Sequence, residues 1–276
     1  MLTQGPRLIN GCGIEIDVGV ITLDLLHLNP SESCSNPHRF LLVTRHIDRN
    51  TENPAMKNAE TPVVKVVLYG AMSSLGSALM AEMLRRQHEV IAILDDLTAL
   101  APRPGLRTKS GDLFEAERVK QSVAGSSTVI CLLDAPGLPF NSEQVEKTIL
   151  PGPVEQVLAV DALIEGLQGA GISRLFLVGD FDVLDEPDIA DRLQLHAAEE
   201  IREALQSCPL HWTMVNAPRA VAGLTIEHFS QVSSSLEPGL GESLERLTRV
   251  ATGIADEMRL NLHVGEHVNF VAASNP

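Results

Sequence analysis

The sequence predicts an α/β protein in which a doubly wound parallel sheet forms a single domain. From residue 61 onward, segments typical of strands alternate with segments typical of helices, which favours a parallel sheet with helices on both faces. The first strand segment, VVKVVLY at residues 63–69, is almost continuously apolar, as expected of a strand buried on both faces. Hydrophobic residues make up 44% of the 276 residues and aromatic residues only 3%, so we expect a substantial aliphatic core.

The predicted strands are short apolar runs that are bounded by glycine, proline or polar residues. They span residues 63–69, 89–94, 106–112, 127–133, 173–179, 210–216 and 267–273.

The predicted helices carry apolar residues at helical spacing. They span residues 74–87, 113–125, 154–171, 190–207 and 242–258. The first ends in basic residues, which suit a helix C-terminus, and the next two end at Gly125 and Gly171. The last helix is expected to bury one stripe, made of Leu244, Leu247, Val250, Ile254 and Met258.

Residues 1–60 differ in composition from the rest of the chain. They contain loop-like stretches such as NPSESCSNPHRF, and a short apolar piece at residues 19–28 that is compatible with an isolated strand or helix. Met56 leads directly into the first strand, as a natural N-terminus would. We therefore expect residues 1–60 to be an extension, poorly ordered or outside the fold, and residues 61–276 to form the domain.

Charge and composition disfavour several classes of function. The net charge is −15, with most of the surplus in residues 61–276, so phosphate backbones would be repelled and nucleic-acid binding is disfavoured. No run of 18 apolar residues indicates a membrane span, and the N-terminus lacks the basic region of a secretory signal. The four cysteines show no CxxC or metal-ligand spacing, which predicts a reduced, cytoplasmic protein without a bound metal.

The segment Gly70–Gly76, GAMSSLG, lies between the first predicted strand and the first predicted helix. A dinucleotide site of this type needs glycine for a tight turn, for close approach of the pyrophosphate and for close helix–strand packing. Gly70 and Gly76 suit the first and last of these roles, whereas Ser73 occupies the second position. The Ser73 hydroxyl could donate to a phosphate or cap the helix, and the helix N-terminus offers N–H groups to an anion. The predicted cofactor-binding residues of this loop are Gly70, Met72, Ser73, Ser74, Leu75 and Gly76.

The second predicted strand is followed by Asp95 and Asp96. An acidic residue about 20 positions after the glycine loop commonly accepts hydrogen bonds from the ribose of NAD, and Asp95 has this spacing. The alternative is that both aspartates cap a loop. The first interpretation predicts that NAD(H) is favoured over NADP(H).

From about residue 64 to the C-terminus, the chain resembles the NmrA-like, NAD(P)H-binding branch of the atypical short-chain dehydrogenase/reductases. The resemblance rests on YGAMSSLG, EVIAILDD, SGDLFEAERVKQSVAGSSTVICLL, ISRLFLVGD and LHWTMVNAPRAV. It implies a Rossmann-like fold whose substrate side is built by the C-terminal part of the chain. It also implies that Asp112 and Leu113 lie near the adenine and that residues 132–135, including Leu132 and Leu133, line the nicotinamide side. Two residues depart from the family pattern: Ser73 replaces the central glycine, and Asp95 replaces a basic residue.

The Tyr–Lys pair of the wider superfamily is absent. Tyr69 is the only tyrosine, and no lysine follows Lys147. By resemblance, Gln194 falls near the position of the tyrosine and Ala198 near that of the lysine.

Other residues are candidates for acid–base work or for contact with a substrate. His196 and Asp134 are candidate acid–base residues, although a solvated histidine and a loop-capping aspartate are the simpler interpretations. Asp180 and Asp182 follow the fifth strand, either near a ligand or as plain surface charges. Met214, Asn216 and Arg219 follow as candidate pocket residues near the end of the sixth strand.

These patterns leave open what the protein does with its cofactor. An oxidoreductase can transfer hydride from nicotinamide to a small acceptor without a dedicated acid, because the hydride chemistry belongs to the cofactor. The alternative is a non-enzymatic redox sensor or regulator that binds a dinucleotide and acts on a protein partner. A scaffold that has lost its ligand is a third possibility. A homodimer is compatible with each of these functions.

Overall fold

The computed structural model describes residues 8–9, 15–16, 63–135, 152–187, 191–218, 220–230 and 240–270. The chain separates into two units, Met1–Asn58 and Ala59–Pro276. In the first unit, strands β1 (Leu8–Ile9) and β2 (Glu15–Ile16) pair antiparallel in a sheet of their own. The apolar segment at residues 19–28 lies outside the described residues. That residues 1–60 lie outside the domain stays a prediction.

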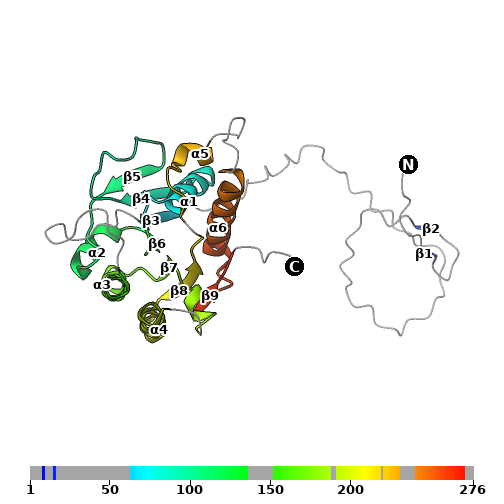
Figure 1. Ribbon diagram of the computed structural model, residues 1–276. Helices are drawn as coiled ribbons and strands as arrows, with labels where there is room; N and C mark the ends of the chain where they lie inside the picture. The colour runs from blue at the N-terminus through cyan, green and yellow to red at the C-terminus, as the bar shows by residue number, and fades with distance from the viewer. Residues whose placement is uncertain are drawn as a thin grey trace, which may run out of the picture. The chain divides into compact units, whose positions relative to one another are not determined.

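The second unit contains a seven-stranded sheet with the order β5-β4-β3-β6-β7-β8-β9, in which all neighbours are parallel (Figure 1). This arrangement confirms the predicted fold class. The strands are β3 (Lys65–Tyr69), β4 (Glu89–Ile93), β5 (Leu106–Lys109), β6 (Thr128–Leu132), β7 (Arg174–Gly179), β8 (His211–Asn216) and β9 (Glu266–Val268).

Helices cover both faces of this sheet, as Figure 1 shows. Helices α1, α5 and α6 pack together, and α2, α3 and α4 pack together on the other side. The helices are α1 (Ser74–Arg85), α2 (Ala116–Val123), α3 (Pro153–Ala170), α4 (Arg192–Ser207), α5 (Ile226–Ser230) and α6 (Leu240–Leu260). The predicted stripe of the last helix faces the core, where Leu244, Leu247, Val250 and Ile254 are buried and Met258 is partly buried.

Some predicted bounds differ from the structure. The third strand ends at Lys109 rather than at Asp112, since its pairing with β4 stops at Ile93–Lys109, level with the end of β4. The short elements η1 (Asp182–Leu184) and α5 were not predicted, because three to five residues are too few to show a helical period. Strand β9 ends at Val268, and residues 271–276 lie outside the described part of the chain.

The direction of winding reverses at β3. This strand pairs with β4 on one side and with β6 on the other, so that Tyr69 lies beside both Ile93 and Cys131. In open α/β sheets, ligands bind in the crevice beyond the carboxyl ends of the strands at such a switch point. The crevice therefore lies beside the Gly70–Gly76 loop.

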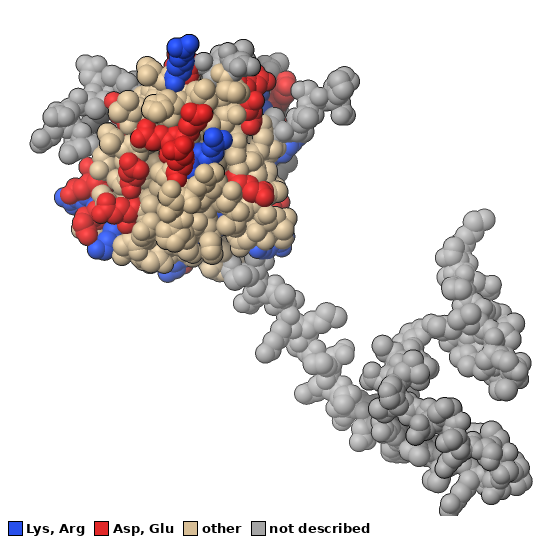
Figure 2. All heavy atoms as spheres, turned by 90° about the horizontal axis from the view of Figure 1, so that it is seen from below, with Lys and Arg blue, Asp and Glu red and all other residues tan. Residues whose placement is uncertain are grey.

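Acidic side chains are grouped over the face that Figure 2 presents, where few lysine or arginine side chains appear. The charge surplus predicted from composition is thus visible on this face. Among the helices of the described residues, none is both long and apolar enough to cross a membrane.

Candidate functional site

The turn after β3 requires glycine at its first position. Gly70 has a φ of +83°, which side chains with a Cβ rarely adopt. A Cβ at this position would lie 2.5 Å from Ala135 Cβ and 2.8 Å from Leu132 Cβ. The loop after β3 and the loop after β6 therefore approach each other closely at the switch point.

The glycine in the first turn of α1 is also required by packing. A Cβ at Gly76 would lie 2.3 Å from the Gly70 carbonyl oxygen and 2.8 Å from the backbone of Ala71. Helix α1 thus packs directly against the turn that precedes it. The two glycines have the geometry that the sequence predicted for the tight turn and the close helix contact.

Ser73 caps helix α1. Its Oγ accepts a hydrogen bond from the Gly76 N–H at 2.9 Å and donates to the Gly70 carbonyl at 2.9 Å. Of the two predicted roles, the hydroxyl therefore performs capping. Within the described residues, no hydrogen bond takes up the N–H groups of Ser74 and Leu75 at the helix N-terminus. These two N–H groups and the helix dipole form a site that favours an anion.

We expect Ser73→Ala to lower the free energy of unfolding by about 1 kcal/mol, because the substitution removes the N-cap. Ser73→Gly should cost only a few tenths of a kcal/mol, since glycine is tolerated at an N-cap. Urea unfolding of both variants measures this difference. Equal losses in the two variants would show that the cap contributes little to stability.

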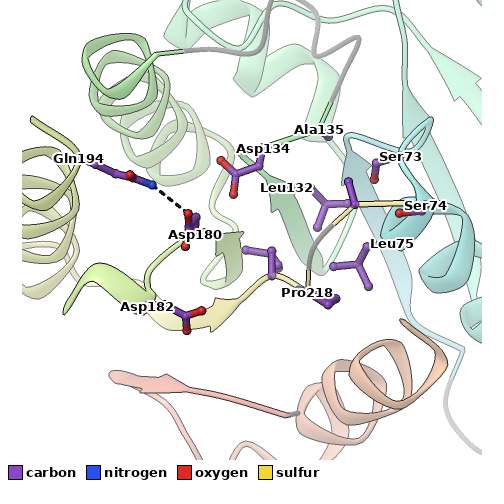
Figure 3. A pocket seen from close by; sticks show the side chains of 13 residues that line it. Ser73, Ser74, Leu75, Leu132, Asp134, Ala135, Asp180, Asp182, Gln194 and Pro218 are labelled. Carbon is purple, nitrogen blue, oxygen red and sulfur yellow. Dashed lines mark hydrogen bonds between the residues drawn. The ribbon is translucent and has the colours of Figure 1, made fainter. Parts of the chain in front are cut away.

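A cavity of about 420 Å³ opens beside this helix N-terminus. Figure 3 shows its walls, which come from α1 and α4, from the loop after β3, and from the ends of β6, β7 and β8 and the loops that follow them. The lining residues are Ser73, Ser74, Leu75, Leu132, Asp134, Ala135, Val178, Asp180, Asp182, Gln194, Ala217, Pro218 and Ala220. The cavity is large enough for part of a dinucleotide together with a small molecule.

Three carboxylates line the cavity on the side away from α1 (Figure 3). Each of them accepts a hydrogen bond from an amide side chain. Gln156 of α3 donates to Asp134 Oδ1 at 2.9 Å, and Gln194 of α4 donates to Asp180 Oδ2 at 3.0 Å. Asn216, which is buried at the end of β8, donates to Asp182. Amides orient these carboxylates without neutralising their charge.

The environment disfavours ionisation of two of the three acids. Burial raises the pKa of the Asp134 carboxyl, hydrogen bonds from the Asp180 N–H and from Gln156 oppose this rise, and the Asp180 charge adds to it. Burial also raises the pKa of Asp182, as do the charges of Asp180 and Asp185. The described residues contain no group of three histidine, cysteine or acidic side chains arranged to hold a metal ion.

The sequence matches the profile of the NAD(P)H-binding family over residues 70–248. The chain belongs to the NAD(P)H-binding family. No curated protein matches the sequence. A candidate epimerase from Bacteroides thetaiotaomicron has a similar structure, with 18% identity and a TM-score of 0.53, covering 78% of this chain and 100% of its own. A candidate NAD-dependent epimerase/dehydratase from Bacillus halodurans has 18% identity and a TM-score of 0.51, covering 77% of this chain and 96% of its own.

These structural likenesses support the fold, and the family match confirms the predicted NAD(P)H-binding resemblance. In this family member, the glycine loop lies within the matched range, and so do all three carboxylates of the cavity. The individual residues that bind the cofactor stay predictions.

The predicted ribose ligand, Asp95, follows the end of strand β4. Strand β4 ends at Ile93, level with Tyr69, and Asp95 is exposed just beyond this end. Asp96 holds the loop, because its Oδ1 accepts hydrogen bonds from the N–H and the hydroxyl of Thr98, at 2.9 and 2.7 Å. The loop-capping alternative therefore holds for Asp96, and the ribose contact of Asp95 stays a prediction.

Other predicted cofactor residues differ in how they meet the cavity. Leu132 lines it. The side chains of Leu113 and Leu133 are fully buried in the core, so only their backbone can contact a ligand. Asp112 Oδ1 accepts a hydrogen bond from the Phe114 N–H at 2.9 Å, which forms a local turn. Met72 lies on the exposed side of the loop and is 43% accessible.

Of the two catalytic candidates, the structure places one at the cavity and the other away from its lining. Asp134 lines the cavity, whereas His196 is exposed on α4 and is not among the lining residues. Gln194, which the resemblance puts near the position of the superfamily tyrosine, lines the cavity, and Ala198 is buried. An amide cannot serve as a general acid, so Gln194 does not replace that tyrosine.

The candidates near the end of β8 have three different outcomes. Met214 does not line the cavity, because its side chain is fully buried in the hydrophobic core. Asn216 acts indirectly through Asp182. Arg219 lies outside the described residues. Pro218 and Ala220 line the cavity but carry no sequence signal that would have predicted this.

Tyr69 is a core residue rather than a catalytic one. Its hydroxyl is 2.6 Å from Ser122 Oγ, which in turn donates to the Val119 carbonyl at 2.8 Å, so Tyr69 is the donor of the pair. Burial raises the pKa of the Tyr69 phenol. The side chain is fully buried and does not line the cavity.

We expect Tyr69→Phe to leave any NADH-dependent turnover within roughly tenfold of the parent, which is about 1.4 kcal/mol of activation free energy. The loss of one buried hydrogen bond should lower stability by about 1 kcal/mol. Steady-state kinetics and thermal melts measure the two effects. A loss of several orders of magnitude in turnover would assign a catalytic role to Tyr69.

Proposed function

We propose that this protein is an NAD(H)-dependent oxidoreductase that transfers hydride from the nicotinamide cofactor to a small acceptor without a Tyr–Lys pair. The observation that carries the proposal is the cavity at the switch point of the sheet. It joins an anion site at the N-terminus of α1 to a wall of carboxylates beyond β6 and β7. Membership of the NAD(P)H-binding family supports the same conclusion.

The residues present fit such a cofactor. The turn at Gly70 and the packing at Gly76 leave no room for a Cβ, so the backbone is held close to the helix N-terminus. The N–H groups of Ser74 and Leu75 would hold the pyrophosphate, and Asp95 would hold the adenosine ribose. The nicotinamide half would then extend towards Leu132 and the carboxylates. When bound, the cofactor supplies the hydride.

The protein's own contribution is to orient the reactants and, where the acceptor needs one, to supply a proton. Asp134 is better placed for this than His196, because it lies on the cavity wall. Burial raises its pKa above that of a free aspartate, which brings this carboxyl closer to the range useful for proton transfer. Acceptors that take up hydride without a protein acid need only to be positioned.

The test is incubation of the full-length protein with NADH and a panel of quinones, flavins and aldehydes, followed at the absorbance of NADH. We expect oxidation of NADH with at least one class of acceptor, and binding of NADH in a separate calorimetric titration. Binding without turnover on any acceptor would contradict the oxidoreductase.

One observation favours a second function, a dinucleotide-dependent sensor that acts on a protein partner. The Tyr–Lys pair is absent, and Gln194 stands near the tyrosine position with its amide bonded to Asp180. A sensor would bind NAD(H), show no turnover, and change its affinity for the partner when the cofactor is reduced.

A further inference from the structure

The negative charge of the cavity wall has no cationic partner among the described lining residues. Asp134, Asp180 and Asp182 are each held by a neutral amide, and no lysine or arginine lines the described part of the cavity. An amide donor fixes the direction of a carboxylate but leaves its charge unpaired.

His267 of β9 lies behind Asn216, on the far side of this wall from the cavity. Its Nε2 donates to Asn216 Oδ1 at 2.6 Å, since the amide nitrogen of Asn216 is already bonded to Asp182. Its Nδ1 lies 3.7 Å from Asp185 Oδ1. His267 therefore holds Asn216 in place behind the wall, and it does not line the cavity, although it lowers the pKa of the nearby Asp182.

The opposite wall has the reverse polarity. Ser73, Ser74 and Leu75 line the same cavity at the N-terminus of α1, where the helix dipole and the N–H groups attract an anion. The cavity thus has a positive end and a negative end. A ligand that matches it carries an anionic group followed by a cationic group. An oxidised nicotinamide dinucleotide has this arrangement, a pyrophosphate and a pyridinium ring, and reduction removes the charge of the ring.

We propose that Asp134, Asp180 and Asp182 shift the affinity of the pocket towards the oxidised cofactor, and so make bound NADH a stronger hydride donor. This inference rests on the proposed function. Hydride transfer from bound NADH would move two electrons and one proton to the acceptor and would leave a positive charge on the nicotinamide ring. Carboxylates that stabilise this cation favour the transfer. For a two-electron couple, each tenfold gain in the ratio of the two affinities lowers the potential of the bound cofactor by about 30 mV.

The experiment measures dissociation constants for NAD⁺ and NADH by calorimetry, with the parent protein and with Asp134→Asn and Asp180→Asn. Asparagine keeps the shape of the side chain and removes the charge. Each variant should lose about fivefold in affinity for NAD⁺, whereas affinity for NADH should stay within about twofold. The double variant should lose more than either single variant.

The matched control is Asp161→Asn. Asp161→Asn removes one negative charge, as each single pocket variant does. Asp161 is exposed on α3 and does not line the cavity, so this charge is lost away from the pocket. Both of its dissociation constants should equal those of the parent. Repeating the titrations at high salt screens the general acidity of the protein, and the effect of the pocket variants should persist.

The outcomes separate this inference from the proposed function. If the parent binds neither nucleotide, the proposed function and the inference both fail. If both nucleotides bind and the ratio of their affinities is the same in the parent and all variants, the charge effect is overturned while cofactor binding stands. An equal loss of affinity for both nucleotides would also overturn it, because the carboxylates would then contribute only to the shape of the pocket and not to discrimination by charge. Thermal melts of each variant establish that it is folded.

Discussion

Gly70→Val should abolish dinucleotide binding, with a loss of at least about a hundredfold, or about 2.8 kcal/mol of binding free energy. A β-branched side chain at Gly70 would overlap Ala135 and Leu132, whose Cβ atoms lie 2.5 and 2.8 Å from the position of the new Cβ. Relief of this overlap requires the loops after β3 and β6 to separate. The N-terminus of α1 would then no longer be held against the crevice. Calorimetry with NADH measures the loss, and circular dichroism shows whether the variant is folded.

Gly125→Val is the control for the backbone conformation. Gly125 also has a φ of +80°, but a Cβ there would meet no atom within 4 Å. Both variants therefore carry the strain of a side chain at positive φ, about 1–2 kcal/mol, and only Gly70→Val adds steric overlap at the crevice. Gly125→Val should bind NADH like the parent. The role of the glycine loop would be refuted if Gly70→Val were folded and bound NADH with unchanged affinity.

The protein should bind NADH ten- to a hundredfold more tightly than NADPH, a difference of roughly 1.4–2.8 kcal/mol. The carboxylate of Asp95 would accept hydrogen bonds from the ribose hydroxyls of NAD and would repel the phosphate that NADP carries at that place. Two unit charges about 4 Å apart repel by roughly 4 kcal/mol at an effective dielectric near 20. Because Asp95 is exposed, solvent reduces this energy, which leads to the smaller expected preference.

Two basic residues near this loop, Arg103 and Lys109, are engaged elsewhere, which supports the preference. Arg103 pairs with Glu227 of α5, and the Lys109 ammonium donates to the Ser122 carbonyl at the end of α2, at 3.1 Å. Arg107 is exposed on β5 and is the cation that could offset the repulsion.

Titration with NADH and NADPH at one ionic strength measures the ratio of the two affinities. Asp95→Asn should reduce this ratio, whereas Asp96→Asn should change it less, since Asp96 holds Thr98. Equal affinities of the parent for the two nucleotides would remove Asp95 from the ribose site.

The sequence alone determined the class of the fold, the order of most of its elements and the position of the glycine turn. This was possible because these properties are local. A strand buried on both faces must be apolar along its length, and a turn with positive φ selects glycine within a few residues. The buried stripe of α6 and the positions of Gly70 and Gly76 could therefore be predicted from the sequence. The absence of the Tyr–Lys pair was equally plain, because no lysine follows Lys147.

Only the tertiary structure decided how the side chains are used. The two roles open to Ser73 could be separated only by the distances from its hydroxyl to Gly70 and Gly76. Leu113, Leu133 and Met214 lie near the ends of strands, but packing turns their side chains into the core. Alternation along a buried strand does not reveal this, since both faces of the sheet are apolar.

The grouping of the three carboxylates at the cavity brings together residues that are far apart in the sequence. Asp134 and Asp182 are 48 positions apart, and their amide partners Gln156 and Asn216 come from α3 and β8. No local pattern encodes such a meeting, because it depends on the order in which seven strands pair. The sequence therefore determined the glycine turn and the NAD(P)H-binding family, and the tertiary structure decided which charges face the cavity beside that turn.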